Sequence, residues 1–196
     1  MKKTILSISF IVCLFFLLPY SYSMANEEAS YDVVQKTDTY EVRYYSDRLI
    51  VQVSNKVDNN SFRKLFKYIS GQNENSEKIA MTIPVTQTQE NGEMFMQFYL
   101  PSKFNKDNVP NPTRSDINIT TIKGGVYAVT QYSGRASDEN FIKYKLILEK
   151  ALIEENISII SPGIKATYNS PFTLPMMRRN EAMFKIEYKG LSLIHI

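Results

Sequence analysis

The sequence predicts an α+β fold, in which two helices pack on an antiparallel sheet or distorted barrel. Three observations lead to this prediction. Two segments have the apolar spacing of amphipathic helices, and several short runs are rich in Val, Ile, Thr, Tyr and Phe with turn residues between them. These segments also follow one order twice, namely strands, a helix and a strand pair. The chain therefore has an architectural repeat, although its two halves share negligible sequence identity.

The first predicted helix covers residues 60–70. Gly71 follows it in the position where glycine commonly ends a helix. Four apolar residues at i, i+3, i+4 and i+7 share one face of this helix: Phe62, Leu65, Phe66 and Ile69.

The second predicted helix covers residues 137–156. Ser137 is its expected N-cap, and Asp138 and Glu139 in the first turn suit the positive end of the helix dipole. Since both helices are amphipathic, each is expected to cover part of a sheet. The apolar face of the second helix consists of Phe141, Tyr144, Leu148, Ala151 and Leu152.

The strands of that sheet are predicted from β-branched and aromatic runs between turn residues. Asn91-Gly92 lies between two such runs and is typical of a type I′ hairpin. A proline-containing loop at residues 102–115 joins the two halves without a domain boundary. The predicted strands are residues 40–53, 80–88, 94–100, 117–122, 125–132, 165–168 and 182–188.

Four sequence blocks carry a resemblance to a known family. The most specific is YNSPFTLPMMRRNE at residues 168–181, and the others are KIAMTIPVT at 78–86, FYLPSKF at 98–104 and YAVTQYSGRAS at 127–137. In this order and spacing they closely resemble the SOUL / heme-binding protein family over residues 31–188. The resemblance implies a distorted antiparallel β-barrel built from two similar βαβ-containing halves, with one flanking helix from each.

Residues 1–25 are expected to be a signal peptide. Lys2 and Lys3 form a positive n-region, residues 5–18 are an apolar run, and a small-x-small cleavage site ends at Ala25. The apolar run is shorter than the roughly 20 residues that span a bilayer, so no membrane insertion is expected after cleavage. The sequence therefore predicts a bacterial protein that is periplasmic or secreted.

Residues 191–196, LSLIHI, match the in-frame translation of the end of a common transposase-type sequencing adapter. They are expected to be a library artefact, and a genuine short apolar tail is the alternative. His195 is the only histidine in the chain, so any histidine chemistry depends on this segment. Residues 26–190 are then expected to form a single domain.

Charge argues against nucleic acid as a partner. The chain has 23 Lys and Arg against 20 Asp and Glu, and loss of Lys2 and Lys3 with the leader leaves 21 cations, a net charge of about +1. A nearly neutral chain of mixed signs has no long-range attraction for polyanions. Cys13 is the one cysteine and also lies in the leader, so no disulfide or thiolate is expected in the mature chain.

An enzyme is not expected either. Without cysteine or a dependable histidine, the common zinc, triad and acid/base constellations cannot be assembled. Gly124-Gly125 is predicted to be a turn between strands and not a phosphate loop. The carboxylate pairs Glu27-Glu28 and Glu154-Glu155 lie at the chain start and at a helix end, where a solvated surface role is expected.

The first predicted helix is the main candidate for a ligand site. Phe62, Phe66 and Ile69 are candidates to line a pocket for a small planar apolar ligand, although ordinary packing on a sheet gives the same spacing. The resemblance implies a shallow apolar cleft for heme or another tetrapyrrole beside this helix. Arg63 and Lys67 flank the apolar face and are candidates to hold the propionates, with solvated helix charges as the alternative.

Methionines in the family blocks are the second candidate. Met81, Met176 and Met177 suit an adaptable apolar surface, although methionine serves equally well as core filler. The loop that carries the last two has Thr173 or Leu174 where the animal heme binders have a basic residue. This difference argues against a complete propionate clamp in the loop.

The motif Arg178-Arg179-Asn180-Glu181 is predicted to form a buried or half-buried polar network that closes the barrel, with ligand contact as the alternative.

The residue that would bind the heme iron is unknown. Tyr44, Tyr45, Tyr68 and several methionines are all candidates as axial ligands, and no spacing selects one of them.

Together these observations predict an exported, non-catalytic protein that binds heme or a related tetrapyrrole for buffering, carriage or scavenging. The alternative is a module similar to the effector-binding domains of transcription regulators and gyrase-inhibitor-like proteins. Such a module would bind another amphipathic small molecule or a protein partner, without heme.

Overall fold

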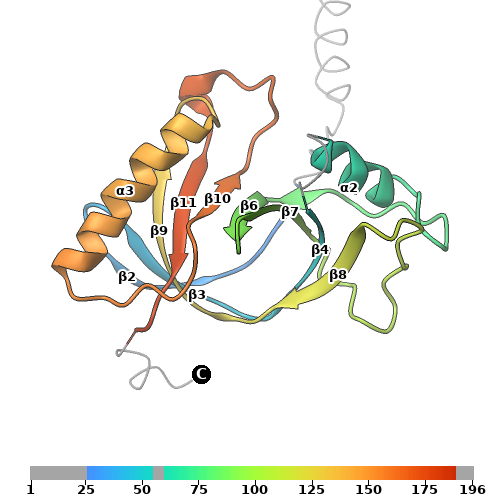
Figure 1. Cartoon of the computed structure of the whole chain (residues 1–196), viewed down its shortest axis with the longest axis horizontal. Helices are drawn as coiled ribbons and strands as arrows, with labels where there is room; N and C mark the ends of the chain where they lie inside the picture. Colours follow the sequence, from blue (N-terminus) through green and yellow to red (C-terminus); the bar gives the residue numbers. More distant parts are fainter. Residues whose placement is uncertain (1–25, 55–59, 189–196) are drawn as a thin grey trace, which may run out of the picture.

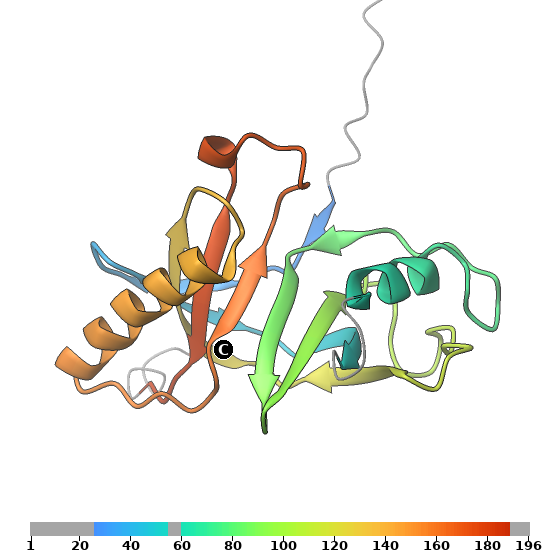
Figure 2. The ribbon, with the colours of Figure 1, turned by 45° about the horizontal axis from the view of Figure 1, so that its top comes forward.

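The computed structural model describes residues 26–54 and 60–188. A nine-stranded sheet curls into a half-barrel, and helices α2 (Ser61–Ile69) and α3 (Asp138–Glu154) lie on its outer face near opposite ends of the sheet (Figures 1 and 2). The α+β prediction with two flanking helices is confirmed. Residues 1–25 and 191–196, including the predicted signal peptide and His195, lie outside the described residues.

The sheet is antiparallel throughout and has the order β2-β3-β9-β11-β10-β6-β7-β4-β8. Its strands are β2 (Asp32–Lys36), β3 (Glu41–Tyr45), β4 (Arg48–Ser54), β6 (Val85–Glu90), β7 (Glu93–Tyr99), β8 (Ile117–Ile122), β9 (Gly125–Tyr132), β10 (Ile164–Thr167) and β11 (Asn180–Lys185). A separate parallel pair is formed by β1 (Glu27–Glu28) and β5 (Thr82–Ile83).

The predicted repeat is visible in this order. The first half runs β4-α2-β6-β7 and the second half runs β9-α3-β10-β11, so each contains a strand, a helix and a strand pair. In the sheet, β9-β11-β10 and β6-β7-β4 are arranged symmetrically about the contact between β10 and β6. This contact joins the two halves and lies between the two helices (Figure 1).

Apolar side chains of β9 alternate between the two faces of the sheet, and both faces are covered. Val126 and Ala128 pack under α3 with Leu148 and Leu152. Their neighbours Tyr127 and Val129 point to the opposite face, where they pack with further residues that include Tyr45, Ala166, Tyr168 and Met183. A period of two residues is what a strand with two covered faces requires.

The predicted helix ends are also present. Gly71 has φ +108°, and the backbone N–H groups of Gly71 and Gln72 donate to the carbonyls of Tyr68 and Lys67. These are the two hydrogen bonds of a Schellman motif.

At the start of α3, the side chain of Ser137 accepts a hydrogen bond from the backbone N–H of Asn140, which confirms Ser137 as the N-cap. The hairpin prediction is confirmed as well, because Asn91 and Gly92 both have positive φ between the paired residues Glu90 and Glu93.

Two predicted strands are each divided in the structure. Residues 40–53 form β3 and β4 with a break at Ser46-Asp47, and residues 80–88 form β5 and β6 with Pro84 between them. The sequence analysis missed β1 and β2, because both are short and β2 is an edge strand with mostly exposed side chains.

None of the helices within the described ranges combines the length and apolar character needed to cross a bilayer.

Candidate functional site

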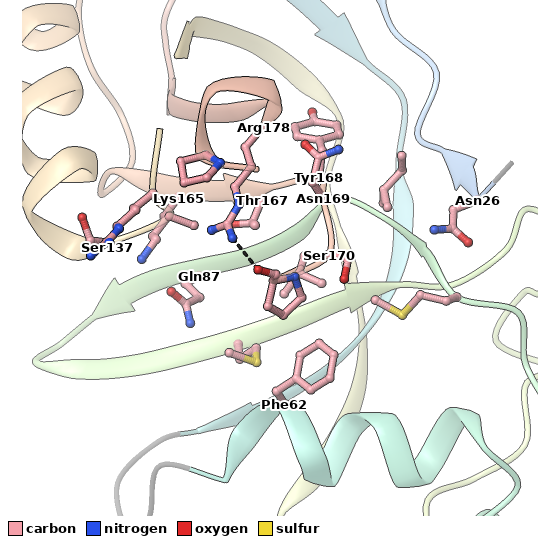
Figure 3. A pocket seen from close by; sticks show the side chains of 18 of the residues that line it. Asn26, Phe62, Gln87, Ser137, Lys165, Thr167, Tyr168, Asn169, Ser170 and Arg178 are labelled. Carbon is pink, nitrogen blue, oxygen red and sulfur yellow. Dashed lines mark hydrogen bonds between the residues drawn. The ribbon is translucent and has the colours of Figure 1, made fainter. Parts of the chain in front are cut away.

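A cavity of about 860 Å³ lies between α2 and the second half of the chain. Its floor is the outer face of β6, β7 and β10, around the contact that joins the two halves. Its other walls are α2, the segment before α3, and residues 169–178, which we call the 169–178 loop (Figure 3). Volumes of roughly 300–1,000 Å³ are typical of pockets for small organic ligands.

One wall of the cavity is apolar. Phe62 and Phe66 stack on α2 with ring centroids 6.0 Å apart and an interplanar angle of 12°, and each is about half exposed. Phe62 also meets Phe98 edge-on at 5.3 Å, which fixes its ring. The apolar lining is completed by Met81, Ile83, Val85 and Met96. A flat apolar ligand can lie against this surface without displacing core side chains.

The opposite wall carries positive charge. Of the described lining residues, three have charged side chains, and all three are cations: Arg135, Lys165 and Arg178. Figure 3 shows Lys165 and Arg178 across the cavity from Phe62, with Gln87 between them. No carboxylate is among these lining residues, and Asp138 beside them pairs with Lys165 alone, so Arg135 and Arg178 favour a ligand with negative groups at one edge.

Two of these cations are also held by the protein. Lys165 is only 8% exposed, and its Nζ lies 2.7 Å from Oδ1 of the solvent-exposed Asp138 at the start of α3. Arg178 donates from Nε to the carbonyl of Thr173 over 2.8 Å and from Nη2 to the carbonyl of Pro171. Their positions are therefore set before any ligand arrives, which lowers the ordering cost of binding.

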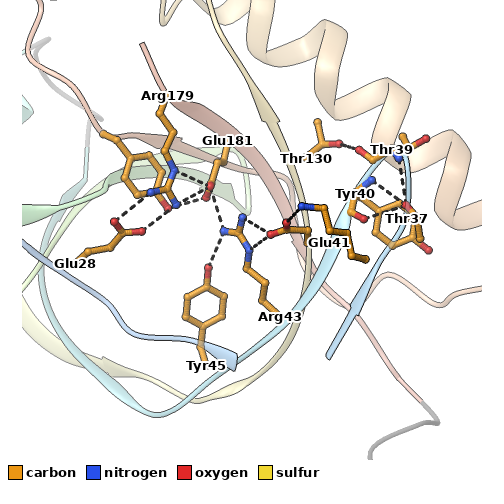
Figure 4. A network of polar contacts seen from close by, with 12 residues as sticks. Glu28, Thr37, Thr39, Tyr40, Glu41, Arg43, Tyr45, Thr130, Arg179 and Glu181 are labelled. Carbon is orange, nitrogen blue, oxygen red and sulfur yellow. Dashed lines mark hydrogen bonds and ion pairs between the residues drawn. The ribbon is translucent and has the colours of Figure 1, made fainter. Parts of the chain in front are cut away.

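Behind the cavity wall lies a buried network centred on Glu181 (Figure 4). Oε1 of Glu181 accepts from Arg43 at 3.1 Å and from Arg179 at 2.9 Å, and Oε2 accepts from the hydroxyl of Tyr168 at 2.6 Å. Arg179 also pairs with Glu28 at 2.9 Å. The predicted polar network is thus confirmed for Arg179 and Glu181, whereas Arg178 turns into the cavity lining.

This network controls the chemistry of Tyr168, the one tyrosine among the described lining residues. Burial, followed by the charge of Glu181, raises the pKa of Tyr168 far above its ordinary value. The phenol therefore stays protonated and donates a hydrogen bond to Glu181. A protonated phenol engaged in this way is a poor axial ligand for iron.

The structure distributes the residues predicted for the heme site over four places. Phe62, Phe66 and Met81 line the cavity together. Arg63 and Lys67 face away from it and line a separate hollow of about 280 Å³.

The remaining predicted residues lie elsewhere. Ile69 is buried in the core between α2 and the sheet with Leu65 and Tyr68. Met176 and Met177 project into solvent from the 169–178 loop, whose Pro175 and Arg178 contribute to the cavity.

The cavity cations were missed by the sequence analysis. Arg135 and Arg178 do lie in two of the four family blocks, so the motif signal was present, but helical spacing drew attention to Arg63 and Lys67 instead. Lys165 is one residue of a four-residue strand and has no distinguishing sequence context.

The lining offers few metal donors. In residues 26–54 and 60–188, no group of three or more His, Cys, Asp or Glu side chains is arranged to hold a metal ion. The soft donors on the cavity surface are the thioether sulfurs of Met81 and Met96.

Comparison with known proteins identifies a family and related chains. The family model described as SOUL heme-binding protein matches residues 26–185. Heme-binding protein 2 of Mus musculus is 29% identical over 173 residues, which cover 81% of this chain and 83% of that protein.

Solved structures show a similar fold at low sequence identity. The EcmrR C-terminal domain aligns with a TM-score of 0.55 and 12% identity, over 76% of this chain and 98% of that one. A hydrolase encoded by lin2189 from Listeria innocua aligns with a TM-score of 0.54 and 9% identity, over 76% and 92% respectively. At these identities the likeness concerns the fold alone.

Proposed function

The chain belongs to the SOUL heme-binding protein family, and on this basis we propose that it binds heme or a related tetrapyrrole in the cavity between α2 and the 169–178 loop. The observation that carries this proposal is the division of the cavity into a stacked phenylalanine wall and a wall of three cations. A heme has the complementary form, with a flat apolar macrocycle and two carboxylates at one edge.

The lining residues fit this ligand in separate roles. Phe62 and Phe66 would pack against the macrocycle face, and burial of apolar area at about 25 cal/mol per Å² would supply most of the favourable free energy. Arg135, Lys165 and Arg178 would bind the carboxylates through charge-assisted hydrogen bonds. A bound heme would supply a redox-active iron, for which Met81 or Met96 is the available donor.

We propose that binding is non-catalytic and serves buffering, carriage or scavenging. The described lining residues include no carboxylate or imidazole, and the Tyr168 hydroxyl is engaged with Glu181, which supports a binding role. The near-neutral charge of the chain without its leader supports a small-molecule ligand and not nucleic acid.

We also propose that the protein is exported, because the apolar run at residues 5–18 and the site ending at Ala25 have the form of a signal peptide. Residues 26–190 would then form the mature single domain. N-terminal sequencing of protein recovered from the periplasm or medium tests this proposal. It predicts a chain that begins at Asn26, and an intact leader on all of the protein would contradict it.

A hemin titration followed by Soret absorbance tests the binding proposal. Saturable one-to-one binding is expected, and His195→Ala should bind equally well because other residues form both walls of the proposed site. Phe66→Ala should weaken binding.

A competing ligand separates this proposal from an amphipathic-ligand module. A bulky organic cation should not displace hemin, because it would face the three cations of the cavity wall. Absence of saturable hemin binding, or displacement by the cation with tight binding of its own, would overturn the tetrapyrrole proposal.

A further inference from the structure

The first residue of the proposed mature chain lies at the ligand cavity. Cleavage after Ala25 leaves Asn26 as the N-terminal residue, and Asn26 is among the residues that line the cavity. Figure 3 shows Asn26 at the start of β1, on the opposite side of the cavity from Lys165. A backbone nitrogen is bonded to its Cα at about 1.46 Å, so cleavage converts a peptide nitrogen at the cavity into a free α-amino group.

The two residues that follow Asn26 hold this end of the chain in place. The carboxylate of Glu27 accepts from the backbone N–H of Ser102 at 2.8 Å, and Glu28 pairs with Arg179 at 2.9 Å. These contacts fix β1 against the rest of the fold before any ligand arrives. The ordering cost of using the N-terminus in a binding site is therefore small.

Strand pairing brings Asn26 to one of the candidate iron donors. In the parallel pair of β1 and β5, Glu27 lies opposite Thr82. Continuing this register by one residue places Asn26 beside Met81, and both residues line the cavity. The new α-amino group thus arises next to a thioether that already faces the ligand space.

The α-amino group supplies a kind of donor that the side chains of the described lining residues do not. The guanidinium groups of Arg135 and Arg178 keep their protons, and amide nitrogens have no free lone pair. Lys165 is held as an ammonium by Asp138 at 2.7 Å. An α-amine, with an ordinary pKa of about 7.7–8.0 against about 10.4 for lysine, gives up its proton more readily. Its lone pair is then free to bind a metal, as the nitrogen of imidazole does in many heme proteins.

We propose that the α-amino nitrogen of Asn26 is an axial ligand of the heme iron. This inference rests on the proposed binding of heme in the cavity and on the proposed cleavage after Ala25. The neutral amine donates its lone pair to the iron, and the proton of its ammonium form passes to solvent. In the precursor the same nitrogen is an amide and cannot act in this way. Removal of the leader would therefore complete the heme site, and tight binding would be confined to the exported chain.

Selective acetylation of the α-amine tests this inference on the folded protein. Exported protein that begins at Asn26 is treated with acetic anhydride at about pH 6.5, where lysine side chains are protonated, and mass spectrometry locates the acetyl group. Modified and unmodified protein are then titrated with hemin and with metal-free protoporphyrin. The metal-free compound has the same macrocycle and carboxylates as hemin, so it reports the cavity walls without the iron.

Acetylation should weaken hemin binding at least about tenfold and shift the Soret band, while protoporphyrin affinity changes less than about twofold. Unchanged hemin affinity with saturable binding of both ligands would overturn this inference and leave the binding proposal intact. Equal weakening of both ligands would also overturn it, because the effect would not involve the iron. Failure of both ligands to bind would overturn the binding proposal and this inference with it.

Isotope labelling gives a direct readout of the bond. Exported protein labelled with ¹⁵N in asparagine is loaded with unlabelled hemin, and pulsed EPR of the ferric iron is recorded. A hyperfine coupling to ¹⁵N is expected, and acetylated protein should not show it. Absence of the coupling in the unmodified protein would overturn the inference. So would a loss of hemin affinity in Met81→Leu with no loss on acetylation, since Met81 would then be the donor on this side of the cavity.

Discussion

Tyr168 donates its phenolic hydrogen to Oε2 of Glu181 over 2.6 Å, at the boundary between the ligand cavity and the buried network. Glu181 is fully buried, and the guanidinium groups of Arg43 and Arg179 occupy its other oxygen. The network therefore replaces the hydration of three charged groups and fixes one cavity wall at the same time.

Glu181→Ala should lower the free energy of unfolding by about 3–5 kcal/mol, because it removes the fully buried carboxylate that Arg43, Arg179 and the Tyr168 hydroxyl share. Urea denaturation measures this change. Glu154→Ala is the control, since Glu154 pairs with Lys150 on an exposed helix surface and should change stability by less than about 0.5 kcal/mol. Similar losses in the two variants would contradict a central role for the network.

Alkaline pH should destabilise the protein through Tyr68. Its hydroxyl donates to the carbonyl of Pro110 over 2.8 Å, and burial raises the pKa of Tyr68 to about 12. The folded state thus holds this proton more tightly than the unfolded chain, so the stabilisation is complete below about pH 10 and is lost as pH rises toward about 12.

Urea denaturation of wild type and Tyr68→Phe at about pH 9 and about pH 11 isolates this effect. Wild type should lose about 1 kcal/mol more than Tyr68→Phe over that interval, because the other tyrosines titrate in both proteins. Equal losses would show that Tyr68 ionises at its ordinary pKa in the folded protein.

The connection between β8 and β9 should not accept a side chain at Gly124. A Cβ atom there would lie 2.5 Å from the backbone oxygen of Tyr45 and 2.9 Å from the backbone carbon of Ser46. Since backbone atoms cannot move aside cheaply, Gly124→Ala should cost about 3 kcal/mol or more in thermal or urea denaturation.

Gly92→Ala in the hairpin turn between β6 and β7 is the control. Its φ of +79° strains an alanine, but no atom lies within 4 Å of the added Cβ, so a loss of about 1 kcal/mol is expected. A Gly124→Ala loss no larger than this would contradict the close approach of Gly124 to the backbone of Tyr45 and Ser46.

Much of the fold was predictable from the sequence because its signals are local. Helix α3 begins at a serine cap, α2 ends in a glycine Schellman motif, and Asn91-Gly92 forms the expected hairpin. The edge strand β2 was missed because exposed edge strands lack the apolar alternation that a buried face imposes.

The site was predictable only in part, since it is assembled from distant segments. Helical spacing identified Phe62 and Phe66, but it could not show that these rings face a cavity while Leu65 and Ile69 enter the core. The cavity cations come from β9–α3, β10 and the 169–178 loop, whose convergence depends on the packing of the second half against the first.

The most direct test of the proposed site compares two arginine variants in a hemin titration of the exported protein. Arg135→Gln removes an exposed cation from the cavity, and Arg63→Gln removes an exposed cation from the other side of α2. The proposed site predicts that Arg135→Gln weakens hemin binding about tenfold through loss of a charge-assisted hydrogen bond, while Arg63→Gln changes it less than about twofold. Weakening by Arg63→Gln with no effect of Arg135→Gln would place the ligand on the opposite side of α2 and contradict the proposed site.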